Sequence, residues 1–250
     1  MSSSSFTPAP LAAQAVAALQ TLADPRVAVQ SRVYFKSDEQ VFFYGVKTPT
    51  ARKLAGELYA QVRNDWSLRE ALQCCDLLLN ECEQEARCVG LYLLARFHKS
   101  FDAKMGAHFE RWLKGNCCDN WALTDELSCQ TIAKWLGQFP DEMPRVLQWT
   151  KAKNLWLRRA SAVALVPLAQ QTAWHATIFA QAERLLACPE DLMHKAVGWL
   201  LREAGQADEA ALRNFLTAHG QQMARTSLRY AIERFPADER KAWLRATRQP

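Results

Sequence analysis

The sequence predicts an all-α protein, and its composition and its periodicity lead to this prediction. The 250 residues include 39 Ala and 31 Leu but only 12 Val and 3 Ile. Ala and Leu have high helix propensities, whereas the β-branched residues that fill strands are scarce. Apolar residues recur with helical spacing along most of the chain, and no Val- or Ile-rich run typical of a parallel sheet is present. A Rossmann or TIM-barrel enzyme is therefore not expected.

The periodicity predicts a series of helices separated by short turn signals. Side chains that favour helix N-caps precede four of them, namely Asp102, Asp119, Asn154 and Asp208. Pro49 and Pro144 fall in predicted first turns, where proline is tolerated. The expected helices span residues 10–23, 26–36, 49–63, 66–80, 82–98, 103–114, 120–137, 141–151, 154–170, 174–187, 190–205, 208–219, 222–235 and 238–247.

These helices form pairs with a regular spacing. The first helices of successive pairs begin near residues 66, 103, 141, 174 and 208, in steps of 37, 38, 33 and 34 residues. A two-helix repeat of this length is the signature of an α-solenoid. We therefore expect a right-handed α-solenoid with a single folded domain over residues 9–248, preceded by a disordered lead at residues 1–8.

The second helices of four pairs share a cation at their second position: Arg87, Arg159, Lys195 and Arg225. Equivalent positions line up in a stacked solenoid, so these cations would form a basic ladder along one surface, expected to be the concave one. The alternative is structural. The same side chains could cap or snorkel at helix starts, and Arg159 could form a salt bridge to a neighbouring helix.

Helix 190–205 carries an aromatic ring between two cations. At about 100° per residue, Lys195, Trp199 and Arg202 fall within about 60° of one another, opposite the apolar face. This arrangement is typical of surfaces that stack on bases and hold phosphates. The alternative is that Trp199 packs against a neighbouring helix.

Helix 120–137 places an indole beside a carboxylate. Leu123 and Leu127 form its apolar face, while Trp121, Asp125 and Ser128 lie together on another face. Trp121 and Asp125 are one turn apart, and together they could hold a cation through the ring quadrupole and the carboxylate charge. The alternative is a surface Asp paired with the acidic residue that follows it.

Charge is unevenly distributed. Residues 1–144 have a net charge of −2, whereas residues 145–250 have a net charge of +7. A basic half favours a polyanionic partner such as nucleic acid, although a solvated helix surface is the simpler alternative.

Several other classes of protein and site are not expected. The eight Cys form no C-x-x-C pair and no zinc-finger spacing, so we interpret them as reduced core residues of a cytoplasmic protein without a metal site. The N-terminus lacks the basic region of a signal peptide, and no apolar run reaches transmembrane length, so no membrane association is expected. Phosphate-binding loops and hydrolase motifs are also absent from the sequence.

Four segments in order resemble the AlkD-type DNA alkylation repair proteins, which are alkylpurine DNA glycosylases built from HEAT-like repeats. The resemblance covers about residues 26–235. The segments are YFK…FFYGVKTPTAR (34–52), DNWALTDELS (119–128), NLWLRRASAVAL (154–165) and LMHKAVGWLLREAG (192–205). In one departure, Asn120 stands where members of the family often carry a second Trp.

The resemblance implies a role for each matching residue. It assigns the active site to Trp121, Asp125, Arg159 and Trp199. It places Tyr34 near this site, and it implies DNA contacts by Tyr34, Arg52 and Arg229. Because Lys195 and Arg202 lie beside Trp199 on one face of helix 190–205, they are also expected to contact DNA.

The activity implied by the resemblance is excision of cationic N3- or N7-alkylated purines from double-stranded DNA in base excision repair. No cofactor or metal is implied, and we expect a monomer. Two alternatives remain open at this point. The chain could bind DNA structures without turnover, or it could be a protein-interaction scaffold, which is a common use of HEAT-like repeats.

Overall fold

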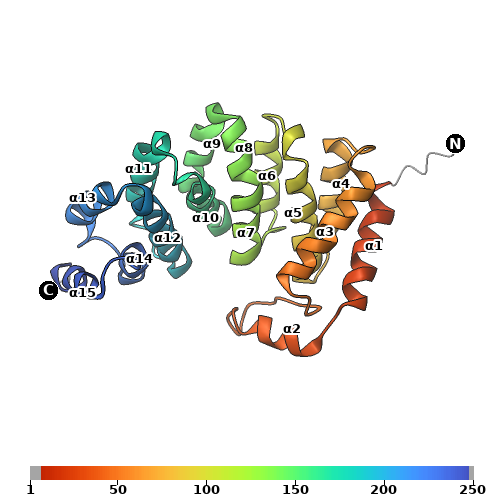
Figure 1. The fold of residues 1–250 in the computed structure, drawn as a ribbon, viewed down its shortest axis with the longest axis horizontal. Coiled ribbons are helices and arrows are strands. Elements are labelled where there is room, and N and C mark those ends of the chain that lie inside the picture. Colours follow the sequence, from red (N-terminus) through yellow and green to blue (C-terminus); the bar gives the residue numbers. More distant parts are fainter. Residues whose placement is uncertain (1–6, 248–250) are drawn as a thin grey trace. The chain divides into compact units, whose positions relative to one another are not determined.

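The computed structural model describes residues 7–247 and confirms the all-α fold class (Figure 1). Within these residues the regular elements are helices, and the only β-type pairing is an isolated bridge between Phe42 and Glu83. The first helix begins at Pro8. The predicted N-terminal lead falls largely on residues 1–6, which lie outside the described residues, as does residue 248.

The chain divides into two compact units. Unit 1 comprises described residues 7–105 and 117–131, and unit 2 comprises residues 106–116 and 132–247. The exchange of short segments between units occurs around α6 (Met105–Lys114), so the boundary does not fall in a simple linker. The extent of the single predicted domain stays a prediction.

Unit 1 is built from helix pairs that pack in series. The helix α5 is its centre, since it packs against α3, α4 and α7, and most of its residues are buried. A Ser67–Glu70 capping box fixes the start of α4. The helices of unit 1 are α1 (Pro8–Thr21), α2 (Pro25–Arg32), α3 (Thr48–Val62), α4 (Leu68–Leu79), α5 (Gln84–Arg96) and α7 (Trp121–Leu127).

The segment between α2 and α3 is fixed to α5 by a buried carboxylate. Glu85, only 6% exposed, accepts hydrogen bonds from the backbone N–H groups of Tyr44 (3.1 Å), Gly45 (2.9 Å) and Val46 (3.0 Å). Gly45 has a φ of +88°, and a Cβ there would lie 2.0 Å from the carbonyl oxygen of Asp24. Only glycine fits this close approach of two backbones.

Unit 2 repeats the same architecture. The long helix α12 packs against α10, α11, α13 and α14, and Figure 1 shows α12 and α14 side by side. Gly198 permits this contact, because a Cβ there would lie 2.6 Å from the carbonyl oxygen of Ser227. The α-helices of unit 2, besides α6, are α8 (Ala133–Gln138), α9 (Met143–Gln148), α10 (Leu155–Val163), α11 (His175–Leu185), α12 (Asp191–Ala207), α13 (Glu209–His219), α14 (Arg225–Ala231) and α15 (Ala237–Ala246).

Several predicted helices are shorter or interrupted in the structure. The helix expected over 26–36 ends at Arg32, because the Arg32 guanidinium binds the carbonyl oxygens of Phe35 (3.1 Å), Lys36 (2.7 Å) and Glu39 (2.6 Å) and holds the chain in a turn. The helix expected over 120–137 contains a π-helical segment at residues 128–132, and the one expected over 154–170 ends its α-helical part at Val163. Helical periodicity does not reveal these interruptions, and the first of them depends on hydrogen bonds from Arg32 to the turn that follows the helix.

The predicted caps are confirmed in part. Asn154 accepts a hydrogen bond from the N–H of Leu157 (3.0 Å), and Asp208 accepts one from the N–H of Ala211 (2.8 Å). Pro49 and Pro144 lie in the first turns of α3 and α9. The prediction for Asp119 is wrong: the residue after it, Asn120, caps α7.

All eight cysteines are free thiols, and their burial varies. Cys74, Cys75 and Cys118 are buried, whereas Cys82 is exposed. Burial raises the pKa of the Cys88 thiol to about 12. The interpretation as small apolar core residues is therefore confirmed for the three buried cysteines and is wrong for the exposed Cys82. No helix in the described part of the chain combines the length and apolarity needed to cross a membrane.

Glu110 joins three elements of unit 2. Its carboxylate accepts hydrogen bonds from Lys114 (2.8 Å), from the indole of Trp149 (3.1 Å) and from Arg145 (3.3 Å). Burial works against ionisation, but these three hydrogen bonds together hold the pKa of Glu110 below its ordinary 4.5.

We therefore expect Glu110→Gln to destabilise the protein by about 1–2 kcal/mol at pH 7. A depressed pKa gives stability that is present above pH 4.5 and is lost as the pH falls through the lowered value. The difference between wild type and variant should therefore shrink toward pH 3. Urea unfolding at both pH values measures it, and equal stabilities at pH 7 would contradict the assignment.

Candidate functional site

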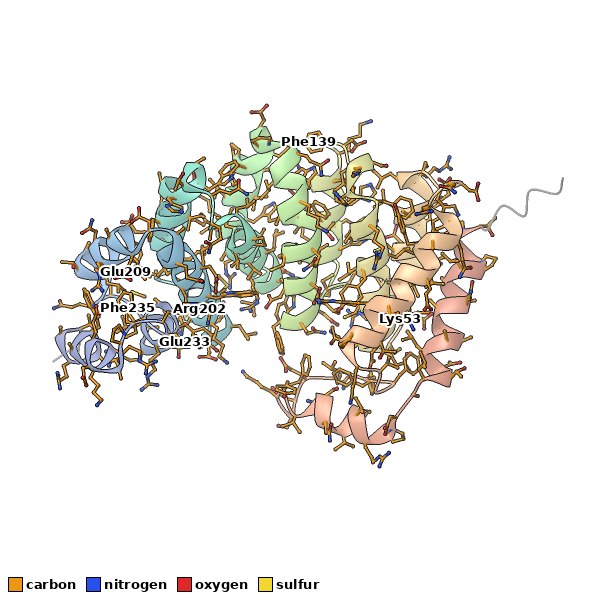
Figure 2. The ribbon with its side chains drawn as sticks, in the orientation of Figure 1. Lys53, Phe139, Arg202, Glu209, Glu233 and Phe235 are labelled. Carbon is orange, nitrogen blue, oxygen red and sulfur yellow. The ribbon has the colours of Figure 1, made fainter. Side chains whose placement is uncertain are left out.

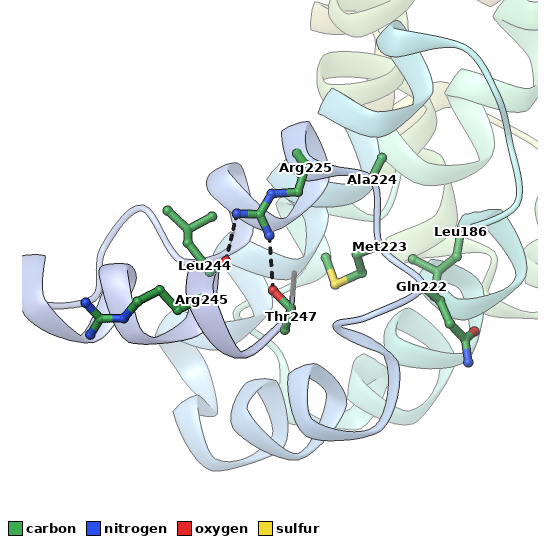
Figure 3. Close-up of a pocket in the computed structure, with 8 residues that line it drawn as sticks. All are labelled: Leu186, Gln222, Met223, Ala224, Arg225, Leu244, Arg245 and Thr247. Carbon is green, nitrogen blue, oxygen red and sulfur yellow. Dashed lines mark hydrogen bonds between the residues drawn. The ribbon is translucent and has the colours of Figure 1, made fainter. Parts of the chain in front are cut away.

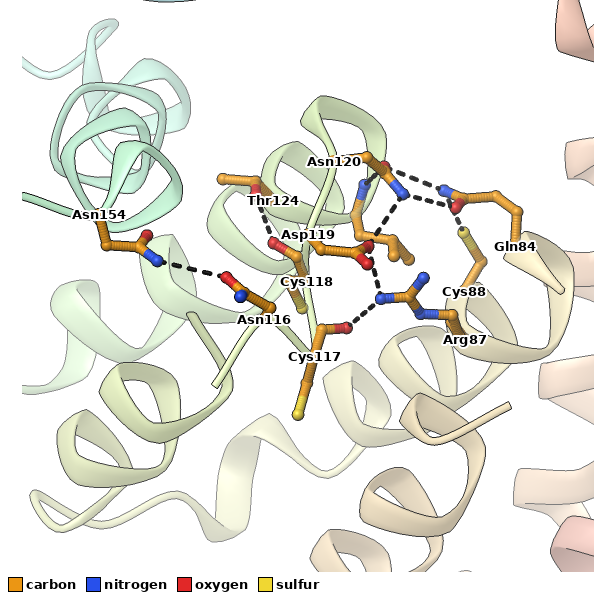
Figure 4. Close-up of polar contacts among 11 residues, drawn as sticks. Gln84, Arg87, Cys88, Asn116, Cys117, Cys118, Asp119, Asn120, Thr124 and Asn154 are labelled. Atoms are coloured by element: carbon orange, nitrogen blue, oxygen red, sulfur yellow. Dashed lines mark hydrogen bonds and ion pairs between the residues drawn. The ribbon is translucent and has the colours of Figure 1, made fainter. Parts of the chain in front are cut away.

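The helix α7, which carries two of the predicted site residues, begins at a buried cap. Asn120 is 2% exposed; its side-chain oxygen accepts from the N–H of Leu123 (3.0 Å), and its amide donates to Gln84 Oε1 (2.9 Å). Figure 4 shows this network between α5 and the start of α7. Asn120, which replaces the Trp expected from the family resemblance, thus fixes the first turn of the helix.

The faces predicted for this helix are confirmed except at one residue. Leu123 and Leu127 are fully buried, while Trp121 and Asp125 are half-buried and one turn apart. Ser128, expected beside them, is completely buried. The π-helical segment that begins at Ser128 changes the angular spacing of side chains, so a projection at 100° per residue fails there.

Trp121 has an aromatic neighbour that the sequence did not reveal. The ring of Phe35 stacks on the indole, with centroids 5.3 Å apart and planes 24° apart, and Phe43 lies 5.6 Å from Phe35. Tyr34, which lies within the helix predicted over residues 26–36, instead follows the end of α2 and is 76% exposed. The turn after Arg32 decides which ring of this segment faces Trp121.

Arg52 is held by two groups of unit 1. Its guanidinium forms an ion pair with Glu126 (2.8 Å) and lies 5.1 Å from the centroid of the Tyr92 ring. Burial opposes the shift, but the charge of Glu126 raises the pKa of Arg52 above its usual range. The Arg52 side chain remains 50% exposed, so it can still meet a ligand in solution.

Two of the four cations at equivalent repeat positions are buried between consecutive helix pairs. Arg87, 8% exposed, donates to the carbonyl oxygen of Cys117 and to Asp119, both at 2.7 Å (Figure 4). Arg159, 4% exposed, donates to the carbonyl oxygen of Leu192. The prediction of an exposed ladder is wrong at these two positions, because both side chains are buried and bind groups that precede or begin a later helix.

The other two cations remain more accessible. Lys195 pairs with Asp191 on its own helix (2.9 Å) and keeps 41% of its side chain exposed. The hydrogen bond from Lys195 lowers the pKa of Asp191. Arg225 donates to the carbonyl oxygen of Leu244 (2.9 Å) and to the hydroxyl of Thr247 (3.2 Å).

The residues predicted on one face of α12 differ in how they are held. Trp199 is half-buried and lies one turn after Lys195. Arg202 is largely engaged by acidic neighbours: it pairs with Glu203 (3.0 Å) and with Glu233, and Figure 2 shows Arg202 and Glu233 pointing toward one another. Arg202 is therefore less available to a ligand than Lys195.

Two cavities are lined by residues of the C-terminal helices. One, of about 680 Å³, is bounded by Met223, Arg225, Leu244 and Thr247, and contains none of the residues predicted for catalysis (Figure 3). A smaller one, of about 320 Å³, is lined partly by Arg229. Among the described residues, no group of three or more His, Cys, Asp or Glu side chains is arranged to hold a metal ion.

Comparisons with known proteins connect this geometry to a family. A solved structure described as a predicted DNA alkylation repair enzyme from Enterococcus faecalis has a TM-score of 0.75 to this chain, with 18% identity, covering 86% of this chain and 97% of that one. At this identity the similarity shows the fold alone. No curated protein matches the chain. The family model for the DNA alkylation repair enzyme matches residues 15–235, and the chain therefore belongs to this family.

Proposed function

We propose that the protein is a DNA glycosylase that releases cationic N3- or N7-alkylated purines from double-stranded DNA. The observation that carries the proposal is the pair on α7: Asp125 is half-buried one helical turn from Trp121. A carboxylate beside an indole suits a positively charged group, and an alkylated purine brings such a group. Membership of the DNA alkylation repair enzyme family supports DNA as the substrate.

The reaction needs little bond chemistry from the protein. The C–N glycosidic bond breaks, and its electron pair leaves with the cationic purine, which departs as a neutral base. The sugar becomes oxocarbenium-like, water adds to its C1′, and a proton passes to solvent. We assign to Asp125 the stabilisation of the developing sugar cation and the orientation of the water. Trp121 would contact the lesion nucleotide through its ring face.

The basic C-terminal half would supply DNA contacts. Residues 145–250 carry a net charge of +7, and Lys195 and Arg229 retain exposed or half-exposed cationic side chains. Trp199 would contact DNA through its ring face. The buried Arg159 binds the carbonyl oxygen of Leu192 in the first turn of α12, so we assign it the orientation of the helix that carries Lys195 and Trp199. Tyr34, Arg52 and Arg202 complete the proposed contacts.

Asp125→Asn tests the chemical role. It should lower release of 7-methylguanine or 3-methyladenine from methylated duplex DNA by at least about 100-fold, the usual scale for losing a catalytic carboxylate. Duplex binding should be retained, because the substitution removes a negative charge and no cation. Single-turnover base release and an electrophoretic shift measure the two quantities.

Asp65→Asn serves as the control for this test, since it removes an exposed carboxylate of unit 1 outside α7. Unchanged release by Asp125→Asn would contradict the assignment of catalysis to this residue. DNA binding by the wild type without any release would favour a non-catalytic DNA-binding protein. An absence of salt-dependent DNA binding would favour a protein-interaction scaffold.

Lys195→Ala tests the backbone contact. If Lys195 meets one phosphate, its loss should reduce the slope of log affinity against log salt concentration by about one. The control is Lys114→Ala, because Lys114 is also paired with a carboxylate one turn away on its own helix. Equal slopes for wild type and Lys195→Ala, measured by fluorescence anisotropy, would exclude the contact.

A further inference from the structure

We propose that Glu85 and Phe35 are positioning residues for Trp121. Phe35 would orient the indole directly, and Glu85 would act through the segment that carries Phe35, residues 33–46. The inference rests on the proposed function, since it concerns the indole that is assigned to the lesion.

Segment 33–46 is held at both ends by charged side chains, although it contains no α-helix. At its start, Arg32 binds four carbonyl oxygens of residues 35–39 at 2.6–3.3 Å. At its end, Glu85 accepts from three consecutive backbone N–H groups at 2.9–3.1 Å. Charge-assisted hydrogen bonds are stronger than neutral ones, and loss of a buried partner leaves N–H groups unsatisfied. The backbone around Phe35 is therefore held by Arg32 at the end of α2, and the far end of the same segment is fixed to α5.

The fixed segment meets α7 through one ring. Phe35 lies against Trp121 at 5.3 Å with nearly parallel planes, and Phe43 supports Phe35 at 5.6 Å. Because Phe35 covers one face of the indole, it selects among the staggered side-chain rotamers of Trp121. A cationic base can then use only the rest of the ring. The position of the ring is thereby set before a ligand arrives.

Burial of apolar surface alone does not account for this arrangement. The segment leaves Val33 and Tyr34 exposed, at 78% and 76%, although both are apolar or aromatic. The ring of this segment that lies against α7 is Phe35. Glu85, a buried carboxylate on α5, secures the other end of the same segment. The order of contacts therefore runs from Glu85 to the segment, then to Phe35 and to Trp121.

The test uses Glu85→Gln, Phe35→Leu and the double variant in the full-length protein. The Gln amide replaces one acceptor oxygen by a donor, and Leu keeps the apolar volume without the ring. Each single variant should slow single-turnover release of 7-methylguanine by about 10-fold, since small misplacements of a contacting group are costly. Duplex affinity should change by less than about 3-fold, because no phosphate contact is removed.

The double variant decides whether the two residues act on the same step. If both act by orienting Trp121, the double variant should be no slower than the slower single variant. Phe35→Tyr should restore the rate to within about 3-fold, because it keeps a stacked ring. The proposal would be overturned if the rate loss of the double variant equalled the product of the two single losses. It would also be overturned if Phe35→Tyr failed to keep the rate near that of the wild type.

Two matched controls separate positioning from stability. Glu110→Gln removes a hydrogen-bonded carboxylate in unit 2, and Phe97→Leu removes a ring that stacks on Trp66 in unit 1, with centroids 6.5 Å apart. Both should lower thermal stability while leaving the rate of the folded protein unchanged. Equal losses of rate in these controls and in the test variants would overturn the proposal.

A second readout does not depend on turnover. The fluorescence difference between each protein and its counterpart with Trp121→Phe isolates the emission of Trp121. Acrylamide quenching of this emission should rise in Glu85→Gln and in Phe35→Leu, because the uncovered indole is more accessible. Unchanged quenching would overturn the inference. Increased quenching in a protein that releases no base would retain the positioning role and contradict only the glycosylase proposal.

Discussion

The arrangement of the helices depends on two buried arginines, Arg87 in the first turn of α5 and Arg159 in α10. Each forms hydrogen bonds with groups at or just before the start of a helix in the next pair. Arg87 binds the carbonyl oxygen of Cys117 and the carboxylate of Asp119 just before α7. Arg159 binds the carbonyl oxygen of Leu192 in the first turn of α12. Each contact spans about one repeat in sequence and fixes the start of a following helix. These hydrogen bonds also give the buried guanidinium groups of Arg87 and Arg159 partners that they would otherwise lack.

These arginine hydrogen bonds determine where the site residues lie. The helix α7 starts directly after the contacts of Arg87, and Asn120 then caps it, so Trp121 and Asp125 occupy its first two turns. In unit 2, α12 starts at the contact of Arg159 and carries Lys195 and Trp199 in the following turns. The conformational entropy lost in ordering these helix starts is offset by charge-assisted hydrogen bonds. The same bonds keep arginines in the interior that a sequence count assigns to a basic surface.

The cationic side chains that make up the net charge therefore fall into two groups, those paired within the fold and those accessible to a ligand. Arg87 and Arg159 join repeats, and Arg202 is engaged by Glu203 and Glu233. Lys195 and Arg229 remain more accessible. A net charge indicates a class of partner, because electrostatic attraction is long-ranged, but it does not identify the side chains that make contact. Those are decided by which cations the fold has already paired.

The sequence by itself determined the fold class, the family and the face of α7. Composition and apolar spacing are properties of short windows, and they sufficed to predict the helix pairs and the shared side of Trp121 and Asp125. Tertiary structure decided the rest. Arg32 ended a helix early and exposed Tyr34, a π-helical turn buried Ser128, and Phe35 came to stack on Trp121. Each of these outcomes depends on backbone turns or on partners many residues away, and helical periodicity contains no information about them.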